Sequence, residues 1–141
     1  MSAILLPFTD GGEVDWPGFA AHVERTAAAG LTPAVNMDTG YVQLLDDATK
    51  AEVLAVTSDL CDAFVGGAHI ADGAGDPFDP GRYAREFDRI AASGGTPVVF
   101  PSHGLNALDA DGWVAAHARL AEGCDRFIAF ANERNGGKGR F

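Results

Sequence analysis

The side chains in this sequence that could carry chemistry gather just after short apolar runs. Residues 36–41, Asn-Met-Asp-Thr-Gly-Tyr, follow one such run and combine hydrogen-bonding groups with a flexible backbone. Loops of this kind, held on a rigid scaffold, carry binding and catalytic residues. We therefore expect Thr39, Asp38 and Gly40 to bind a small polar ligand. The alternative for Thr39 is that its hydroxyl caps its own turn.

Two histidines lie after later apolar runs. His69 precedes Asp72, and His103 follows Ser102. Because imidazole changes its charge near neutral pH, His103 is a candidate catalytic acid or base; the alternative is a loop histidine that hydrogen-bonds to backbone. A third possibility is a divalent metal ion held by His69, Asp72 and His103. Asp38 would complete that set, but spacing across different strands cannot test it.

The elements that must position these residues repeat along the chain. Five apolar, strand-like runs recur about every 30 residues, which is the length of one strand–helix–strand unit. They centre on Leu5 (residues 4–8), Val35, Val65, Val99 and Ile128. Four amphipathic segments separate them, and an aspartate suited to an N-cap precedes three: Asp15, Asp46 and Asp79. The pattern predicts five strands alternating with four helices.

Parallel strands joined by helices form either a doubly wound sheet or a (β/α) barrel. The sequence has no glycine-rich nucleotide-binding motif after its first strand, and polar residues instead follow almost every strand. A ring of polar strand ends is typical of the C-terminal face of a barrel. We therefore predict an α/β fold, a partial (β/α)8 TIM barrel of about four and a half units, over residues 1–131. Residues 132–141 form a Gly-rich polar tail, and no cofactor is expected.

Composition limits the partners of this chain of 141 residues. Its net charge of −10 excludes nucleic acid and anionic membranes as partners. No segment is apolar over the roughly 18 residues that a membrane span requires, and the N-terminus lacks the features of a signal peptide. Cys61 and Cys124 fall on predicted helices among apolar neighbours, where reduced cysteines are common. We therefore expect a cytoplasmic protein.

Three stretches resemble the dihydrodipicolinate synthase and N-acetylneuraminate lyase family. Residues 6–15, Leu-Pro-Phe-Thr-Asp-Gly-Gly-Glu-Val-Asp, resemble the family's first strand and the start of its first helix. Residues 37–41 lie where the family has Gly-Thr-Thr-Gly-Glu, and residues 98–103, Val-Val-Phe-Pro-Ser-His, lie where it has a strand ending in Pro-Tyr-Tyr. The resemblance covers residues 4–130, which correspond to the N-terminal half of a TIM-barrel aldolase of this family.

This resemblance implies a site for a 2-oxo acid such as pyruvate. In the family, paired threonines bind the substrate carboxylate, a tyrosine after the fourth strand relays protons, and a lysine on the sixth strand forms a Schiff base. By position, Thr39 is the second threonine and His103 replaces the tyrosine. Asp38 replaces the first threonine and would repel a carboxylate, which indicates a divergent branch with different substrate chemistry.

The lysine strand of the family has no counterpart in this sequence. The only lysines are Lys50, expected on the exposed first turn of the second helix, and Lys138, in the tail. A Schiff-base lysine must be desolvated on a rigid element, so we expect no imine with pyruvate. We interpret the chain as a truncated family member that is inactive alone. The alternatives are the metal-dependent aldolase or hydrolase already described and a non-catalytic half barrel that persists by association.

Association is expected because a five-stranded partial barrel leaves unpaired strand edges. Barrel-facing side chains such as Leu5 and Ile128 would also be exposed. Both features promote contact between copies of a chain. We therefore predict a homo-oligomer.

Overall fold

The structure, a computed structural model, describes residues 1–129. Within them one parallel sheet contains five strands that follow one another in chain order. The strands are β1 (Ser2–Ala3), β2 (Pro33–Val35), β3 (Val65–Ala68), β4 (Thr96–Val99) and β5 (Ile128–Ala129). This is the strand order of a TIM barrel, so the predicted partial barrel is confirmed. The predicted tail, residues 132–141 with Lys138, lies outside the described residues.

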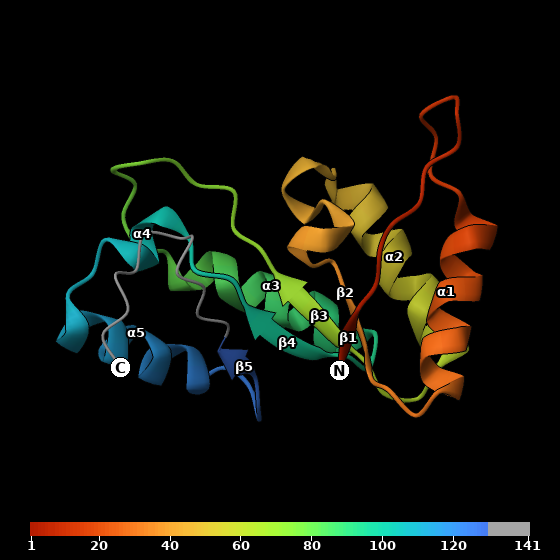
Figure 1. The fold of residues 1–141 in the computed structure, drawn as a ribbon. Coiled ribbons are helices and arrows are strands. Elements are labelled where there is room, and N and C mark those ends of the chain that lie inside the picture. The colour runs from red at the N-terminus through yellow and green to blue at the C-terminus, as the bar shows by residue number, and fades with distance from the viewer. Residues whose placement is uncertain (130–141) are drawn as a thin grey trace.

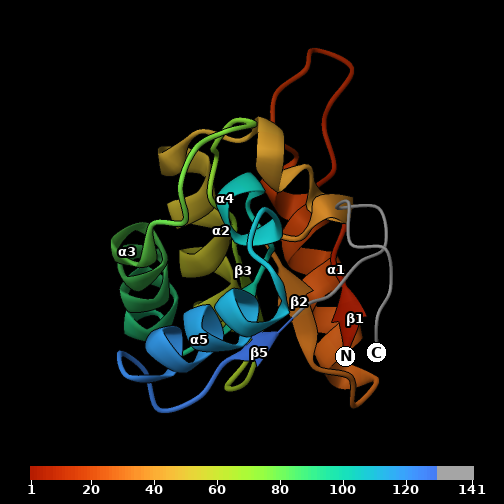
Figure 2. The same ribbon diagram turned by 90° about the vertical axis from the view of Figure 1, so that its left-hand side faces the viewer.

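The helices alternate with the strands and cover one face of the sheet. The four longer ones are α1 (Trp16–Ala28), α2 (Asp47–Leu60), α3 (Pro80–Ala92) and α5 (Ala110–Ala121). Figures 1 and 2 show them around the outside of the curved sheet, with α1 beside α2 and α3 beside α5. The loops that follow the strands carry a short helix, α4 (His103–Asn106), and two 3-10 turns, η1 (Asp38–Gly40) and η2 (Val42–Leu44).

Aspartate side chains fix where the helices begin. Asp15 accepts a hydrogen bond from the Gly18 amide at 3.0 Å, and Asp46 accepts one from the Thr49 amide at 2.8 Å. Asp79 caps α3 in the same way. A carboxylate at this position satisfies amide groups that have no partner inside the helix. The three helix starts predicted from sequence are therefore confirmed.

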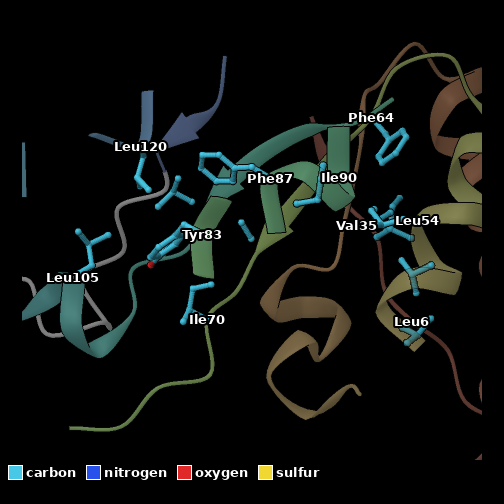
Figure 3. Packing of buried hydrophobic residues seen from close by; sticks show 14 of the residues in the cluster. Leu6, Val35, Leu54, Phe64, Ile70, Tyr83, Phe87, Ile90, Leu105 and Leu120 are labelled. Carbon is cyan, nitrogen blue, oxygen red and sulfur yellow. The ribbon is translucent and has the colours of Figure 1, made fainter. Parts of the chain in front are cut away.

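Successive side chains of each strand point to opposite faces of the sheet, so the core has two layers. Val35 and Val99 point to the helices, where they join a large apolar cluster. Figure 3 shows this cluster running from Leu105 and Leu120, past side chains of α3, to Leu54 and Leu6. The neighbouring strand residues Ala34 and Val98 belong to a second, smaller cluster with Met37, Val65 and Phe100. Because successive side chains of a strand point to opposite faces, this second cluster marks the barrel interior.

The first strand lies earlier than the sequence pattern predicted. The run at residues 4–8 continues the ladder only as far as Ile4, whose amide donates to the carbonyl of Ala34 at 2.9 Å. Farther on, Phe8 pairs with Val14 in an isolated antiparallel bridge, so this part of the run closes a local turn. Leu5 is left 54% exposed.

Two smaller expectations also differ from the structure. Cys61 is the residue that follows α2, and Cys124 lies beyond the end of α5, so neither cysteine is inside a helix. Both are free and partly buried. No helix in residues 1–129 is long and apolar enough to cross a membrane.

Candidate active site

A hollow of about 570 Å³ opens at the C-terminal ends of β2, β3 and β4. Polar and apolar residues from the three loops after these strands line it. They are Asp38, Val42, Gln43, His69, Ile70, Ala71, Asp72, Phe100, Pro101, Ser102 and His103. The C-terminal face is where barrel enzymes place their catalytic groups. Asp38, His69, Asp72 and His103, which the sequence places after three different strands, therefore meet at one opening.

Asp72 joins the loop after β3 to the loop after β4. Its two carboxylate oxygens each accept a backbone hydrogen bond at 2.8 Å, one from the amide of His103 and one from the amide of Gly104. These are the first amides of α4, which would otherwise have no partner within the helix. Ser102 completes the cap, because its hydroxyl accepts a hydrogen bond from the Leu105 amide at 3.1 Å. His103 therefore begins a helix instead of lying in a loop.

These hydrogen bonds also determine the charge of Asp72. Partial burial by itself raises the pKa of the carboxyl group, but the amides of Gly104 and His103 and the Ser102 side chain act together in the opposite direction. The net effect is a pKa below its ordinary value. Asp72 is therefore a carboxylate at neutral pH, and each of its oxygens accepts one backbone hydrogen bond.

Tyr83 fixes the end of β4 from behind the hollow. Its buried hydroxyl donates to the carbonyl of Phe100 at 2.6 Å and accepts from the amide of Ser102 at 3.0 Å. Burial raises the pKa of this phenol despite the hydrogen bonds with Ser102. Tyr83 therefore positions the wall of the hollow as a neutral side chain.

His69 and His103 line the hollow in different surroundings. His103 is exposed at the rim, whereas His69 is half-buried. The Nδ1 atom of His69 is fully buried and has no hydrogen-bond partner. Burial, and then the positive charge of Lys50, lower the pKa of His69; Asp72 opposes this effect and Arg82 adds to it.

Lys50 is not on an exposed turn, as the sequence suggested. Its side chain is only 16% exposed, and its Nζ atom lies 3.8 Å from a carboxylate oxygen of Asp47. The turn is attached to the end of β2, because the Asn36 side-chain amide donates to the carbonyl of Lys50 at 3.1 Å. Asn36 is 5% exposed and has a φ of 52°, a conformation for which asparagine is better suited than most residues. The backbone reversal at Asn36 turns its side chain toward α2.

The predicted ligand-binding residues of η1 are separated by the structure. Asp38 lines the hollow together with His103, and its carboxylate accepts a hydrogen bond from the Thr39 amide at 2.9 Å. Thr39 is exposed and Gly40 is buried, and neither lines the hollow. A Cβ atom at Gly40 would lie 3.3 Å from the carbonyl of Ile4, so the glycine allows close packing. A ligand-binding role for Thr39 and Gly40 stays a prediction.

The metal-ion interpretation of His69, Asp72 and His103 is wrong for the part of the chain that the structure describes. No group of three or more His, Cys, Asp or Glu side chains among residues 1–129 is arranged to hold a metal ion. The carboxylate of Asp72 already accepts two backbone hydrogen bonds. Its function in this fold is to cap α4.

Sequence reasoning missed two features of this site. One is that the positive charge of Lys50 acts on His69, and the other is that Asp72 caps a helix 31 residues farther along the chain. Neither leaves a local signal, since both depend on how successive β–α units pack together. The short helix α4 could have been found from Ser102, which is a common N-cap residue three positions before Leu105.

Solved aldolase structures share this fold. The 2-keto-3-deoxygluconate aldolase of Sulfolobus solfataricus, as a variant, matches 93% of this chain with a TM-score of 0.67 and 16% identity. Dihydrodipicolinate synthase from Bacillus clausii matches 90% with a TM-score of 0.66 and 17% identity. CdNal from Clostridium difficile, solved with mannosamine, matches 90% with a TM-score of 0.52 and 13% identity. The chain covers 43%, 42% and 53% of these three structures, respectively.

No family model and no curated protein sequence matches the chain. The solved structures confirm the resemblance to the dihydrodipicolinate synthase and N-acetylneuraminate lyase family at the level of the fold. The segment that matches is about half, or less, of each solved structure.

Proposed function

We propose that this chain forms the N-terminal part of a barrel that binds a small 2-oxo acid at the C-terminal ends of its strands. The observation that supports this most directly is the hollow itself. It brings His103, His69 and Asp38 together from three successive β–α units. In the barrel fold this end carries the chemistry, and the hollow is large enough for a ligand the size of pyruvate.

His103 is the side chain best placed for proton transfer at the rim. It is exposed, it lines the hollow, and its backbone is fixed by Asp72. Thr39 and Gly40 would add hydrogen-bonding groups if the η1 loop moved toward a bound ligand. The carboxylate of Asp38 in the wall disfavours a second carboxylate beside it. A bound oxo acid would therefore direct its own carboxylate away from Asp38.

Imine chemistry would require a lysine that lines the hollow. Among residues 1–129 Lys50 is the only lysine. It is not part of the lining, and an Asp47 carboxylate oxygen lies 3.8 Å from its amine. We infer that this chain binds the oxo acid but does not form a Schiff base with it. Incubation with pyruvate and borohydride should leave the mass of the protein unchanged. A stoichiometric mass increase mapped to a lysine would contradict this inference.

Binding can be tested by titrating pyruvate into the protein and following the histidine ring resonances by NMR. The signals of His69 and His103 should move, whereas those of His22 in α1 and His117 in α5 should not. His103→Asn should weaken binding, and His22→Gln should leave it unchanged. If pyruvate shifts no histidine resonance, or shifts all four equally, the proposed site is wrong.

A second candidate is a non-catalytic half barrel that persists by association. The observation that favours it is Leu5, which is 54% exposed beside the first strand of the sheet. The two candidates differ in one measurable property, because a purely structural half barrel would associate without binding pyruvate.

A cytoplasmic location also stays a prediction. It is based on the two cysteines, which are both free.

A further inference from the structure

We propose that His69 is the proton-accepting side chain of the hollow and that Lys50 keeps its imidazole in the neutral form. The proton-accepting role rests on the proposed function, because it needs a ligand in the hollow. The role of Lys50 does not, because it concerns the protein alone. His69 would be a catalytic residue, and Lys50 a positioning residue that acts through it.

The burial of His69 leaves one ring nitrogen for a ligand. His69 lines the hollow, yet its Nδ1 atom is buried without a hydrogen-bond partner. Nε2 is then the ring nitrogen left to reach a ligand. An imidazolium ion would bury an unpaired N–H donor that carries positive charge, which is costly. The resting ring is therefore neutral. In the tautomer that carries its hydrogen on Nδ1, Nε2 can accept a proton, and the costly imidazolium lasts only until it releases that proton.

The fold attaches the turn that carries Lys50 to the strand next to the one that leads into His69. The hydrogen bond from Asn36 to the carbonyl of Lys50 joins the first turn of α2 to the end of β2, next to β3. The Lys50 side chain is then largely covered, at 16% exposure, and its charge reaches His69. Its carboxylate neighbour Asp47 is 72% exposed and 3.8 Å away, so solvent weakens the neutralisation of the ammonium charge. A cation at this place opposes a second positive charge on His69.

Charged groups on other elements also affect the protonation of His69. Asp72, in the loop after β3, favours the charged imidazole, but its carboxylate is shared with two amides of α4. Arg82, on α3, opposes the charge, and its guanidinium donates to the carbonyl of Ala71 at 2.9 Å. Asp38 and His103 complete the wall of the hollow. Lys50 is the stronger of the two cationic influences on His69.

The chemical step that follows is enolisation of a 2-oxo acid. Neutral His69 removes a proton from C3, the C3–H electron pair forms the C2–C3 double bond, and the carbonyl oxygen becomes an enolate. In this step His103, which also lines the hollow, donates a hydrogen bond to that oxygen. The imidazolium of His69 exchanges its proton with solvent and returns one to C3. In D2O the product is therefore pyruvate that carries deuterium in its methyl group.

The first test concerns Lys50 and needs no ligand. The ionisation of each histidine is followed by NMR across a pH range in the wild-type chain, in Lys50→Gln and in Lys50→Arg. Removal of the cation in Lys50→Gln should raise the pKa of His69, whereas Lys50→Arg should leave it depressed. An unchanged His69 titration in Lys50→Gln overturns the role of Lys50.

The second test concerns proton transfer. The loss of pyruvate methyl protons in D2O is measured against buffer alone and against His22→Gln as a matched histidine control. His69→Asn should slow the protein-dependent exchange by about a hundredfold or more, which is the usual contribution of a general base. Lys50→Gln should move the pH of half-maximal exchange upward, and Lys50→Arg should restore it. A merely structural role for Lys50 would not move that profile.

The outcomes separate the two proposals. If pyruvate binds but wild-type exchange equals that of buffer, or if His69→Asn exchanges as the wild type does, the proton-accepting role is wrong and the proposed function stands. If pyruvate does not bind at all, both the proposed function and the proton-accepting role are wrong. The titration of Lys50→Gln still decides whether Lys50 controls the charge of His69.

Discussion

Asp72 and His69 lie on one wall of the hollow, yet the fold stabilises a different charge state of each. Asp72 is supplied with backbone donors, which favour its carboxylate. His69 has a buried nitrogen without a partner and a cation nearby, which favour the neutral ring. Titratable groups whose surroundings favour different charge states are a feature of sites that transfer protons.

The capping role of Asp72 predicts a loss of stability in Asp72→Asn. The amide side chain has one acceptor oxygen, so either the His103 or the Gly104 amide would lose its partner. We expect the free energy of unfolding to fall by about 1–3 kcal/mol, measured by urea denaturation at pH 7. Asp76→Asn is the matched control, because Asp76 accepts one hydrogen bond in an exposed loop, from Gly73 at 2.8 Å. An equal effect in both variants would contradict the special role of Asp72.

The surroundings of His69 predict a dependence of stability on pH. The pKa of His69 in the folded chain lies below its ordinary value of 6.5. The unfolded chain therefore takes up a proton first, and stability falls as the pH drops below about 6.5 toward the folded-state pKa. His69→Asn should show a shallower loss of stability between pH 7 and pH 5 in urea titrations, whereas His22→Gln should keep the wild-type slope. Asp72 acts in a separate, more acidic range, below its ordinary pKa of 3.8.

At the residue scale, the sequence located polar groups better than it described their surroundings. Asp38, His69, Asp72 and His103 all reach the hollow, as expected from their positions after strands. The burial of Lys50 and the cap that Asp72 provides were not predictable. Both depend on contacts between residues that are distant in the chain, for which an isolated sequence has no local signal.

At the scale of elements, the loop after β3 is attached to α4. Asp72 binds the first amides of that helix, and Arg82 holds the carbonyl of Ala71 at the start of the loop. At Gly104 the backbone of α4 lies very close to the backbone of this loop. A Cβ atom placed there would lie 2.5 Å from the carbonyl carbon of Pro77 and 2.6 Å from the amide nitrogen of Phe78. These are backbone atoms, which cannot turn aside as a flexible side chain could.

Gly104→Ala should therefore force the loop and α4 apart. We expect a loss of about 1–3 kcal/mol in the free energy of unfolding, as for overpacking in a well-packed region. The variant should also move the His69 and His103 resonances, because Gly104 directly follows His103 and both histidines line the hollow. Gly123→Ala is the control, since the nearest atom to its added Cβ is 3.8 Å away. If Gly104→Ala is as stable as the wild type and leaves both resonances in place, the close approach does not shape the site.

The accuracy of sequence reasoning at this scale follows from local physics. Aspartate N-caps and apolar periodicity are encoded within a few residues, so α1, α2 and α3 begin where expected. Strand β1 was displaced because Phe8 pairs with Val14 instead of continuing the sheet. Helix α4 was missed because four residues are too few to produce a helical apolar pattern.

For the whole molecule, the open sheet matters most for association with other copies of the chain. Among the described residues β1 pairs only with β2, and β5 pairs only with β4, so each has a free edge. Leu5 is 54% exposed beside the first of these edges. Unpaired edges with exposed apolar side chains favour pairing with another chain. The fold supports the expectation of association without showing it.

We therefore expect the chain to associate in a concentration-dependent manner in sedimentation velocity experiments. Leu5→Lys should weaken this association, because a charged side chain beside an edge strand opposes contact with another apolar surface. Val114→Lys is the matched control, because Val114 is also exposed, at 64%, but lies on helix α5 and not beside the first strand of the sheet. If surface charge in general controlled association, both variants would weaken it equally. If the wild-type chain sediments as one sharp species whose coefficient does not change with concentration, the open edges do not drive association.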